Sequence, residues 1–292
     1  MNLERVEKIV NAVLYEGYIL YPYRASSIKN RQRWNFGVLY PPSWCARQKG
    51  SDASSLHSEF LVRGDADVFV RLRFLRIVER AATGTFPAWQ EAEDREIGGA
   101  QTFSLEAGTE EGRRYDEVRG AMQVRTTRIA DRLFRIAVDV ENRTDLPESA
   151  TRDEALLRSL ASAHLIITAE RGELISLLDP PPELAEAAAA CRNAGVFPVL
   201  AGDEGDHDVM LASPIILYDH PRVAPESPGD LYDGTEIDEI LSLRIRSLTE
   251  DEKREIRGLD ERARRLLDRT ESLTAADLMA LHGTIRPGEE EP

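Results

Sequence analysis

Residues 21–34 combine basic and aromatic side chains in a pattern that suits an anionic partner. The candidate binding residues are Tyr21, Tyr23, Arg24, Lys29, Asn30, Arg31, Arg33 and Trp34. Aromatic rings and arginines dominate the binding energy of protein interfaces. The same mixture holds single-stranded nucleic acids through base stacking and phosphate pairing. A structural interpretation also fits, with core strands over YILYPY and WNFGVLYPP and a basic loop between them.

A second group of candidate side chains lies in residues 218–245. Three prolines in this segment favour an extended path, and long ordered loops of this kind are often functional. The candidate binding residues are Asp230, Asp233, Glu236, Asp238 and Glu239. Paired carboxylates could perform acid–base chemistry or bind a metal. Acids that follow an N-capping Thr235 would instead complement a helix dipole, which is the simpler explanation.

The familiar catalytic and cofactor motifs are missing from the sequence. It has no glycine-rich nucleotide loop, no nucleophile elbow, no zinc-protease motif and no calcium loop. Its two cysteines, Cys45 and Cys191, lie far apart, which argues against a cysteine-rich metal site. The acidic stretch at 202–208 could hold a cation through oxygen ligands, although a Gly- and Asp-rich turn explains it more simply. The sequence therefore assigns no catalytic residue and predicts no cofactor and no metal.

The charge distribution argues against general nucleic-acid binding. The chain of 292 residues has a net charge of −15, yet residues 1–50 hold eight Lys or Arg and only three Asp or Glu. Affinity for nucleic acids comes mainly from Lys and Arg that neutralise phosphates. The sequence also lacks an apolar run of the roughly 20 residues that cross a bilayer, and its N-terminus lacks the apolar block of a signal peptide. We therefore expect a cytoplasmic protein that is not inserted in a membrane.

Hydrophobic periodicity predicts a β-rich chain. Residues 58–80 alternate with period two and predict two strands around a turn at RGDA. Further strands are expected at about 91–106, 115–129 and 132–142, the last two joined by a hairpin turn at Ala130–Asp131. Short strands and an alanine-rich helix follow in the second half.

Helices are expected at both ends of the chain. Apolar residues recur at helical spacing in residues 3–16, and a capping box at Thr249 and Glu252 starts a helix that runs to Leu267. The predicted fold is α+β and mainly antiparallel β, sandwich- or barrel-like, with an N-terminal helix and a C-terminal helical tail. Its predicted parts are a β domain (1–148), a closely packed α/β or β half (149–248), a helical tail (249–286) and a disordered end (287–292).

Three long segments resemble an uncharacterised bacterial family. They are LYEGYILYPYRASSIKNRQRWNFGVLYP, GELISLLDPPPELAEAAAACRNAGVFPVLAG and MLASPIILYDHPRVAPESPGDLYDGTEIDEILSLRIRSLTEDEK. The family is associated with gene clusters for uptake nickel–iron hydrogenases. The resemblance implies an accessory protein that assembles, matures or scaffolds the hydrogenase. It implies a protein partner, either a hydrogenase subunit or a maturation factor.

Three functions are compatible with the sequence. The favoured one is a non-catalytic docking protein. The alternative is an enzyme, resembling a metal-dependent hydrolase, whose site is formed where residues 21–33 meet the acids of 230–239. Binding of single-stranded nucleic acid ranks third.

Overall fold

The computed structural model describes residues 3–14, 37–48, 50–82, 88–222, 249–250, 253–254, 257 and 261–272. The chain divides into two compact units. The first unit comprises Met1–Gly17 and Trp34–Arg222, and the second comprises Tyr18–Arg33 and Val223–Pro292. The described β-structure belongs to the first unit.

Antiparallel strands make up most of the first unit, which confirms the predicted α+β, mainly antiparallel fold. The strands are β1 (Ser55–Arg80), β2 (Trp89–Gly98), β3 (Gln101–Leu105), β4 (Gly108–Glu110), β5 (Arg113–Tyr115), β6 (Val118–Ala130), β7 (Leu133–Asn142), β8 (Leu160–Ile175), β9 (Asn193–Ala194), β10 (Phe197–Leu200) and β11 (Val209–Ser213). The main path through the sheet runs β10-β11-β8-β1-β7-β6-β3, while β2, β5 and β9 also pair with β1 and β4 pairs with β5.

Short helices accompany the strands. They are α1 (Leu3–Leu14), α2 (Pro42–Arg47), α3 (Arg152–Leu156), the 3₁₀ helix η2 (Pro182–Leu184) and α4 (Ala185–Ala189) in the first unit, and α7 (Glu261–Ser272) in the second. The predicted N-terminal helix and the predicted alanine-rich helix are thereby confirmed. So is the β6–β7 hairpin, in which Ala130 pairs with Leu133.

β1 and β8 pair along much of their length and share an irregularity that lets the sheet fold over. The register shifts between Gly64 and Asp67, next to Gly172 of β8. Gly64 has a φ of +103°, and a Cβ on Gly172 would lie 2.5 Å from the Cβ of Ala66. Two backbones that approach this closely need glycine. The predicted turn at RGDA is therefore wrong: β1 continues through this point because β8 follows it, and both halves of β1 pair with β8.

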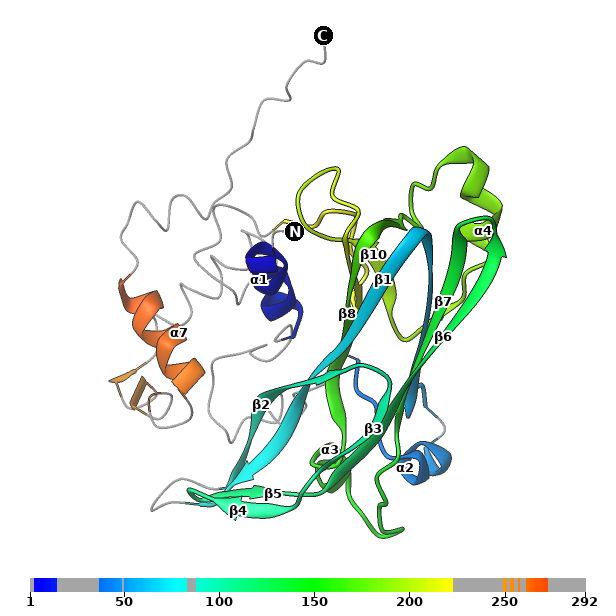
Figure 1. Ribbon diagram of the computed structural model, residues 1–292. Coiled ribbons are helices and arrows are strands. Elements are labelled where there is room, and N and C mark those ends of the chain that lie inside the picture. Colours follow the sequence, from blue (N-terminus) through cyan, green and yellow to red (C-terminus); the bar gives the residue numbers. More distant parts are fainter. Residues whose placement is uncertain are drawn as a thin grey trace. The chain divides into compact units, whose positions relative to one another are not determined.

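The folded sheet encloses the main core between two layers, with β7 and β6 on one side and β8 and β10 on the other (Figure 1). The first half of β1 contributes Phe60 to this core and the second half contributes Phe74. Leu165 of β8 and Met210 of β11 belong to the same core. Residues on both sides of position 148 thus share one core, and each fully buried side chain of this size contributes about 1.5–3 kcal/mol.

The outer face of β8 and β11 is covered by α1. The contacting apolar side chains are Val6, Ile9 and Val10 of the helix and Ile166, Val209 and Leu211 of the strands. These helical positions are spaced three and one residues apart, so they lie on one face of α1.

The second unit contains two helical segments that fold back on each other. Lys253 pairs with Glu271 at 3.0 Å, and Arg257 pairs with Asp268 at 3.5 Å. A continuous helix would separate Lys253 from Glu271 by roughly 27 Å. The single helix predicted from Thr249 to Leu267 is therefore wrong.

Candidate functional site

The site residues predicted from the sequence lie outside the described residues. This applies to the basic–aromatic group, namely Tyr21, Tyr23, Arg24, Lys29, Asn30, Arg31, Arg33 and Trp34, and to the acidic group, namely Asp230, Asp233, Glu236, Asp238 and Glu239. The enzyme alternative requires these two groups to meet, and that stays a prediction. The described chain begins again at Gly37, whose carbonyl accepts a hydrogen bond from the amide of Ala163 in β8 at 2.9 Å.

The aromatic residues that follow the basic group are structural. Leu39 forms only isolated bridges, to Ala53 and Leu160, and α2 begins at Pro42. The strand predicted over WNFGVLYPP is therefore wrong at its C-terminal end, because the prolines end the extended stretch and start a helix. Trp44 is buried, and its indole donates to Asp52 at 2.9 Å.

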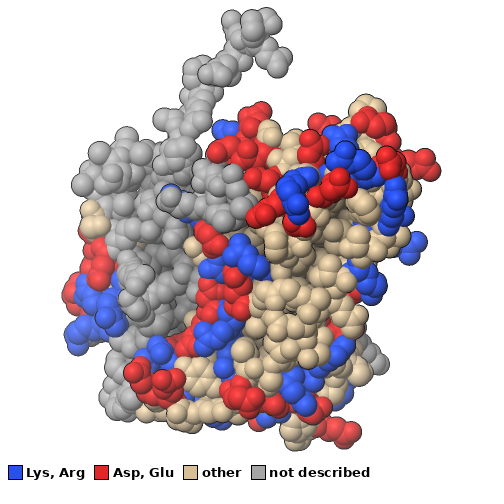
Figure 2. Space-filling model, viewed as in Figure 1, with Lys and Arg blue, Asp and Glu red and all other residues tan. Residues whose placement is uncertain are grey.

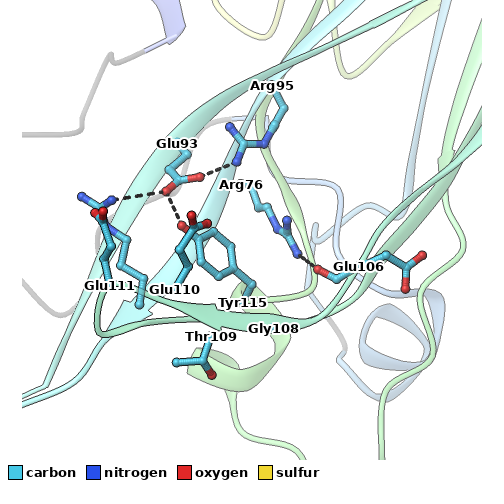
Figure 3. Close-up of a pocket in the computed structure, with 10 residues that line it drawn as sticks. Arg76, Glu93, Arg95, Glu106, Gly108, Thr109, Glu110, Glu111 and Tyr115 are labelled. Carbon is cyan, nitrogen blue, oxygen red and sulfur yellow. Dashed lines mark hydrogen bonds and ion pairs between the residues drawn. The ribbon is translucent and has the colours of Figure 1, made fainter.

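A highly charged cavity lies beneath the β4–β5 hairpin. It has a volume of about 560 Å³ and is lined by residues of β1, β2, β4 and β5. Arg76, Arg95, Arg113 and Tyr115 are among the lining residues, and we call it the Arg76 cavity. Figure 3 shows Arg76 of β1, Arg95 of β2 and Tyr115 of β5 converging on it.

Arg76 is unusual because it occupies an inward position of β1. Phe74 and Val78, two residues away on either side, are fully buried, and Arg76 itself is only 6% exposed. Its Nη2 donates to the main-chain carbonyls of Glu106 at 2.6 Å and Asp116 at 2.8 Å. Its guanidinium also lies 4.9 Å from the ring centre of Tyr115.

Among the described residues, Arg76 lacks a directly paired carboxylate. No carboxylate of the described chain lies within 4.0 Å of its guanidinium, and its buried Nε has no hydrogen-bond partner there. Burial lowers the pKa of Arg76 and the nearby Arg95 lowers it further, whereas Glu93, Tyr115 and Asp116 oppose this shift without reversing it. An uncompensated buried charge is costly, and such groups cluster at functional sites.

Two carboxylates of β2 fasten the β4–β5 hairpin over the cavity. Glu91 is buried and accepts hydrogen bonds from Arg80 at 2.8 Å and from Arg113 of β5 at 2.9 Å. Glu93 accepts a hydrogen bond from Tyr115 at 2.7 Å and pairs with Arg95 (Figure 3). Both acids are thus engaged by groups other than Arg76.

A second feature is the segment 214–220, which follows β11. Its side chains alternate: Ile215 and Leu217 pack against the apolar cluster under α1, whereas Ile216 and Tyr218 are 75% and 87% exposed. Asp219 fixes the segment to the edge strand β10, because its carboxylate accepts from the amide of Leu200 at 2.7 Å. The amide of His220 donates to the carbonyl of Leu200 at 2.8 Å. The exposed side chains therefore stand on anchored backbone.

The histidines of the described chain do not form a metal centre. Within the residues described, no three His, Cys, Asp or Glu side chains are grouped to hold a metal ion. His164 is completely buried, donates through Nδ1 to the carbonyl of Ser162 at 2.8 Å and has a pKa lowered to about 4 by burial. The acidic stretch at 202–208 is a turn in which the Asp206 carboxylate accepts from the amide of Asp203 at 2.9 Å.

Acidic and basic side chains are interleaved on the face of the molecule shown in Figure 2, without a large area of one sign. Ion pairs also join neighbouring strands of the sheet, such as Arg63 with Glu173 at 2.6 Å.

Of the helices in the described part of the chain, none is long and apolar enough to span a membrane.

Comparison with known proteins finds no match, either to a protein-family model or to a curated protein.

The Arg76 cavity was not predicted from the sequence. Its signal was present, because Arg76 is the charged residue in the inward series Val70, Leu72, Phe74, Arg76 and Val78. A residue that breaks a local pattern in this way marks a position to inspect for function.

Proposed function

We propose that the protein is a non-catalytic docking protein of the cytoplasm whose partner is a nickel–iron hydrogenase subunit or a maturation factor of that enzyme. The identity of the partner rests on the family resemblance of the three long sequence segments. The docking role rests on one observation, the exposure of Ile216 and Tyr218 on anchored backbone.

Exposed apolar side chains on a fixed segment favour association. Large apolar groups gain most when a partner removes them from water, and tyrosine is enriched among the residues that dominate interface energies. Because Asp219 and His220 already hold the segment against β10, ordering it costs little on binding. The free thiols of Cys45 and Cys191 are consistent with a reducing compartment.

The proposal is tested by recovering the partner with a tagged protein from a native host grown under hydrogenase-inducing conditions. We expect the wild-type protein to recover a hydrogenase subunit or a maturation factor. The double variant Ile216→Ser, Tyr218→Ser should recover at least tenfold less, which corresponds to a loss of about 1.4 kcal/mol. Ile129→Ser is the matched control, because Ile129 is another exposed apolar side chain, at the end of β6.

Two results would contradict the proposal. The first is recovery of neither kind of hydrogenase protein by the wild type with the tag at either terminus. The second is equal recovery by the wild type and the double variant, which would remove the segment 214–220 from the interface.

A further inference from the structure

We infer that the Arg76 cavity binds a carboxylate group, with the guanidinium of Arg76 as its charged partner. This site is separate from the segment 214–220: Figure 1 shows β4 and β5 at the opposite end of the first unit from β10. The inference therefore does not depend on the proposed docking function.

The first support is the position of Arg76. The alternation along β1 predicts an apolar side chain at this position. Arg76 is only 6% exposed, so the burial of its charged guanidinium costs desolvation energy. Its hydrogen bonds go to neutral main-chain carbonyls at Glu106 and Asp116. These bonds orient the group but are not ion pairs, and Glu93 and Asp116 act on its charge only from beyond 4.0 Å. An anion in the cavity would therefore supply the direct ion pair that Arg76 lacks among the described residues.

The second support is that Glu91, Glu93 and Asp116 are already engaged by other groups and that Glu106 is turned away. Asp116 pairs with Arg114 at 3.4 Å and with Arg158 at 3.0 Å. Glu93 is paired with Arg95 and Tyr115, and Glu91 with Arg80 and Arg113. The side chain of Glu106 points away from Arg76 in Figure 3, and it accepts a hydrogen bond from Ser104 at 3.2 Å. None of these pairs would have to break for an anion to approach Arg76.

The acids of the cavity select the kind of anion. Glu93, Glu106, Glu110 and Glu111 all line it, so the lining carries more acidic than basic residues. A phosphate dianion would meet strong repulsion from these groups. A carboxylate carries a single charge and matches the planar fork of a guanidinium. The carboxylate is therefore the anion that fits, whether it belongs to a small acid or to a peptide C-terminus.

The test is a titration of the full-length protein at constant ionic strength, followed by NMR of the arginine Nε–Hε groups. The probes are acetate for a small acid and N-acetylglycine for a peptide C-terminus. N-acetylglycinamide is the uncharged control, and inorganic phosphate is the dianionic control. We expect saturable shifts of the Arg76 signal with at least one carboxylate probe at millimolar concentration, and no saturation with N-acetylglycinamide or phosphate.

Three variants separate binding from folding. Arg76→Lys keeps the charge but removes the fork, and it should weaken carboxylate binding at least tenfold. Arg95→Gln, at a more exposed position of the cavity, should weaken it severalfold and serves if Arg76→Lys does not fold. Arg71→Lys changes an outward arginine of the same strand, paired with Glu96, and should bind like the wild type.

The result also identifies the source of the carboxylate. Tighter binding of N-acetylglycine than of acetate would point to a peptide C-terminus, and the reverse order to a small acid. Absence of saturable shifts with both carboxylates would overturn the inference. So would equal binding by N-acetylglycinamide, tighter binding by phosphate, or unchanged affinity in both folded cavity variants. None of these outcomes affects the docking test, which uses other residues.

Discussion

Protonation of His164 should make the stability of the sheet depend on pH. His164 is fully buried in β8, and its neutral ring donates through Nδ1 to the Ser162 carbonyl. Burial lowers its pKa from 6.5 to about 4, and the positive charge of Arg73 also lowers it, while the bond to Ser162 opposes the shift. Replacement by asparagine, His164→Asn, removes the titrating ring and keeps an amide donor near the position of Nδ1.

The sign follows from which state binds the proton first. As the pH falls through 6.5 the unfolded chain protonates while the folded protein does not, so folding stability decreases until the folded pKa near 4 is reached. The full shift corresponds to about 3 kcal/mol. Between about pH 7.5 and about pH 5, the same two pKa values give a loss of about 2 kcal/mol in the free energy of unfolding.

The measurement is urea unfolding of both proteins at these two pH values, followed by circular dichroism of the sheet. The wild type should lose about 2 kcal/mol more than His164→Asn on going to the lower pH. His207→Gln, in the exposed 202–208 turn, is the control for replacing a histidine that is not buried. The reasoning is refuted if His164→Asn and the wild type lose the same amount, whatever their stabilities at the higher pH.

Three other predictions test the framework around the two sites. Gly172→Ala should destabilise the protein by about 1–3 kcal/mol in urea, because the added Cβ meets Ala66 and the Arg63 carbonyl; Gly98→Ala, where a Cβ meets nothing within 4 Å, should cost much less. Glu91→Gln should cost about 3 kcal/mol because it leaves two arginines without their buried acid, whereas Glu96→Gln breaks an exposed pair and should cost less than about 1 kcal/mol. Burial raises the thiol pKa values of Cys45 and Cys191, so both should react with iodoacetamide at neutral pH more slowly than free glutathione, as followed by mass spectrometry. Equal costs in either matched pair, or faster alkylation of either thiol, would contradict the corresponding argument.

Local patterns in the sequence were sufficient for individual strands and short helices. The period-two alternation of β1 and β7 and the helical spacing in α1 reflect burial of one face, which a sequence displays directly. The RGDA segment was not predictable in this way, because a turn and a bend use the same residues locally. The difference is made by Gly172, more than 100 positions later, which lets β8 follow β1 through the bend. The pairing of Lys253 with Glu271 likewise joins residues 18 positions apart, which a local pattern does not display.

The two mostly buried arginines of β1 show why burial and charge alone do not identify a binding group. Arg73 and Arg76 lie three residues apart in the same strand, so their side chains are on opposite faces of the sheet. Arg73 faces outward beneath α1, where it pairs with Asp94 and Glu7. Although burial opposes it, these two acids raise the pKa of Arg73 above its ordinary value.

Arg76 has the opposite electrostatic state, since burial and Arg95 lower its pKa. An added anion would find Arg73 already paired with two carboxylates. Arg76 has no direct ion pair to a carboxylate of the described residues, although Glu93 and Asp116 act on its charge from farther away. The interaction of an anion with a guanidinium is strongest where no competing carboxylate is bound and water is excluded. Of these two arginines, Arg76 is therefore the one whose charge remains for a ligand. Arg73 is also mostly buried, but its ion pairs with Asp94 and Glu7 give it a structural role.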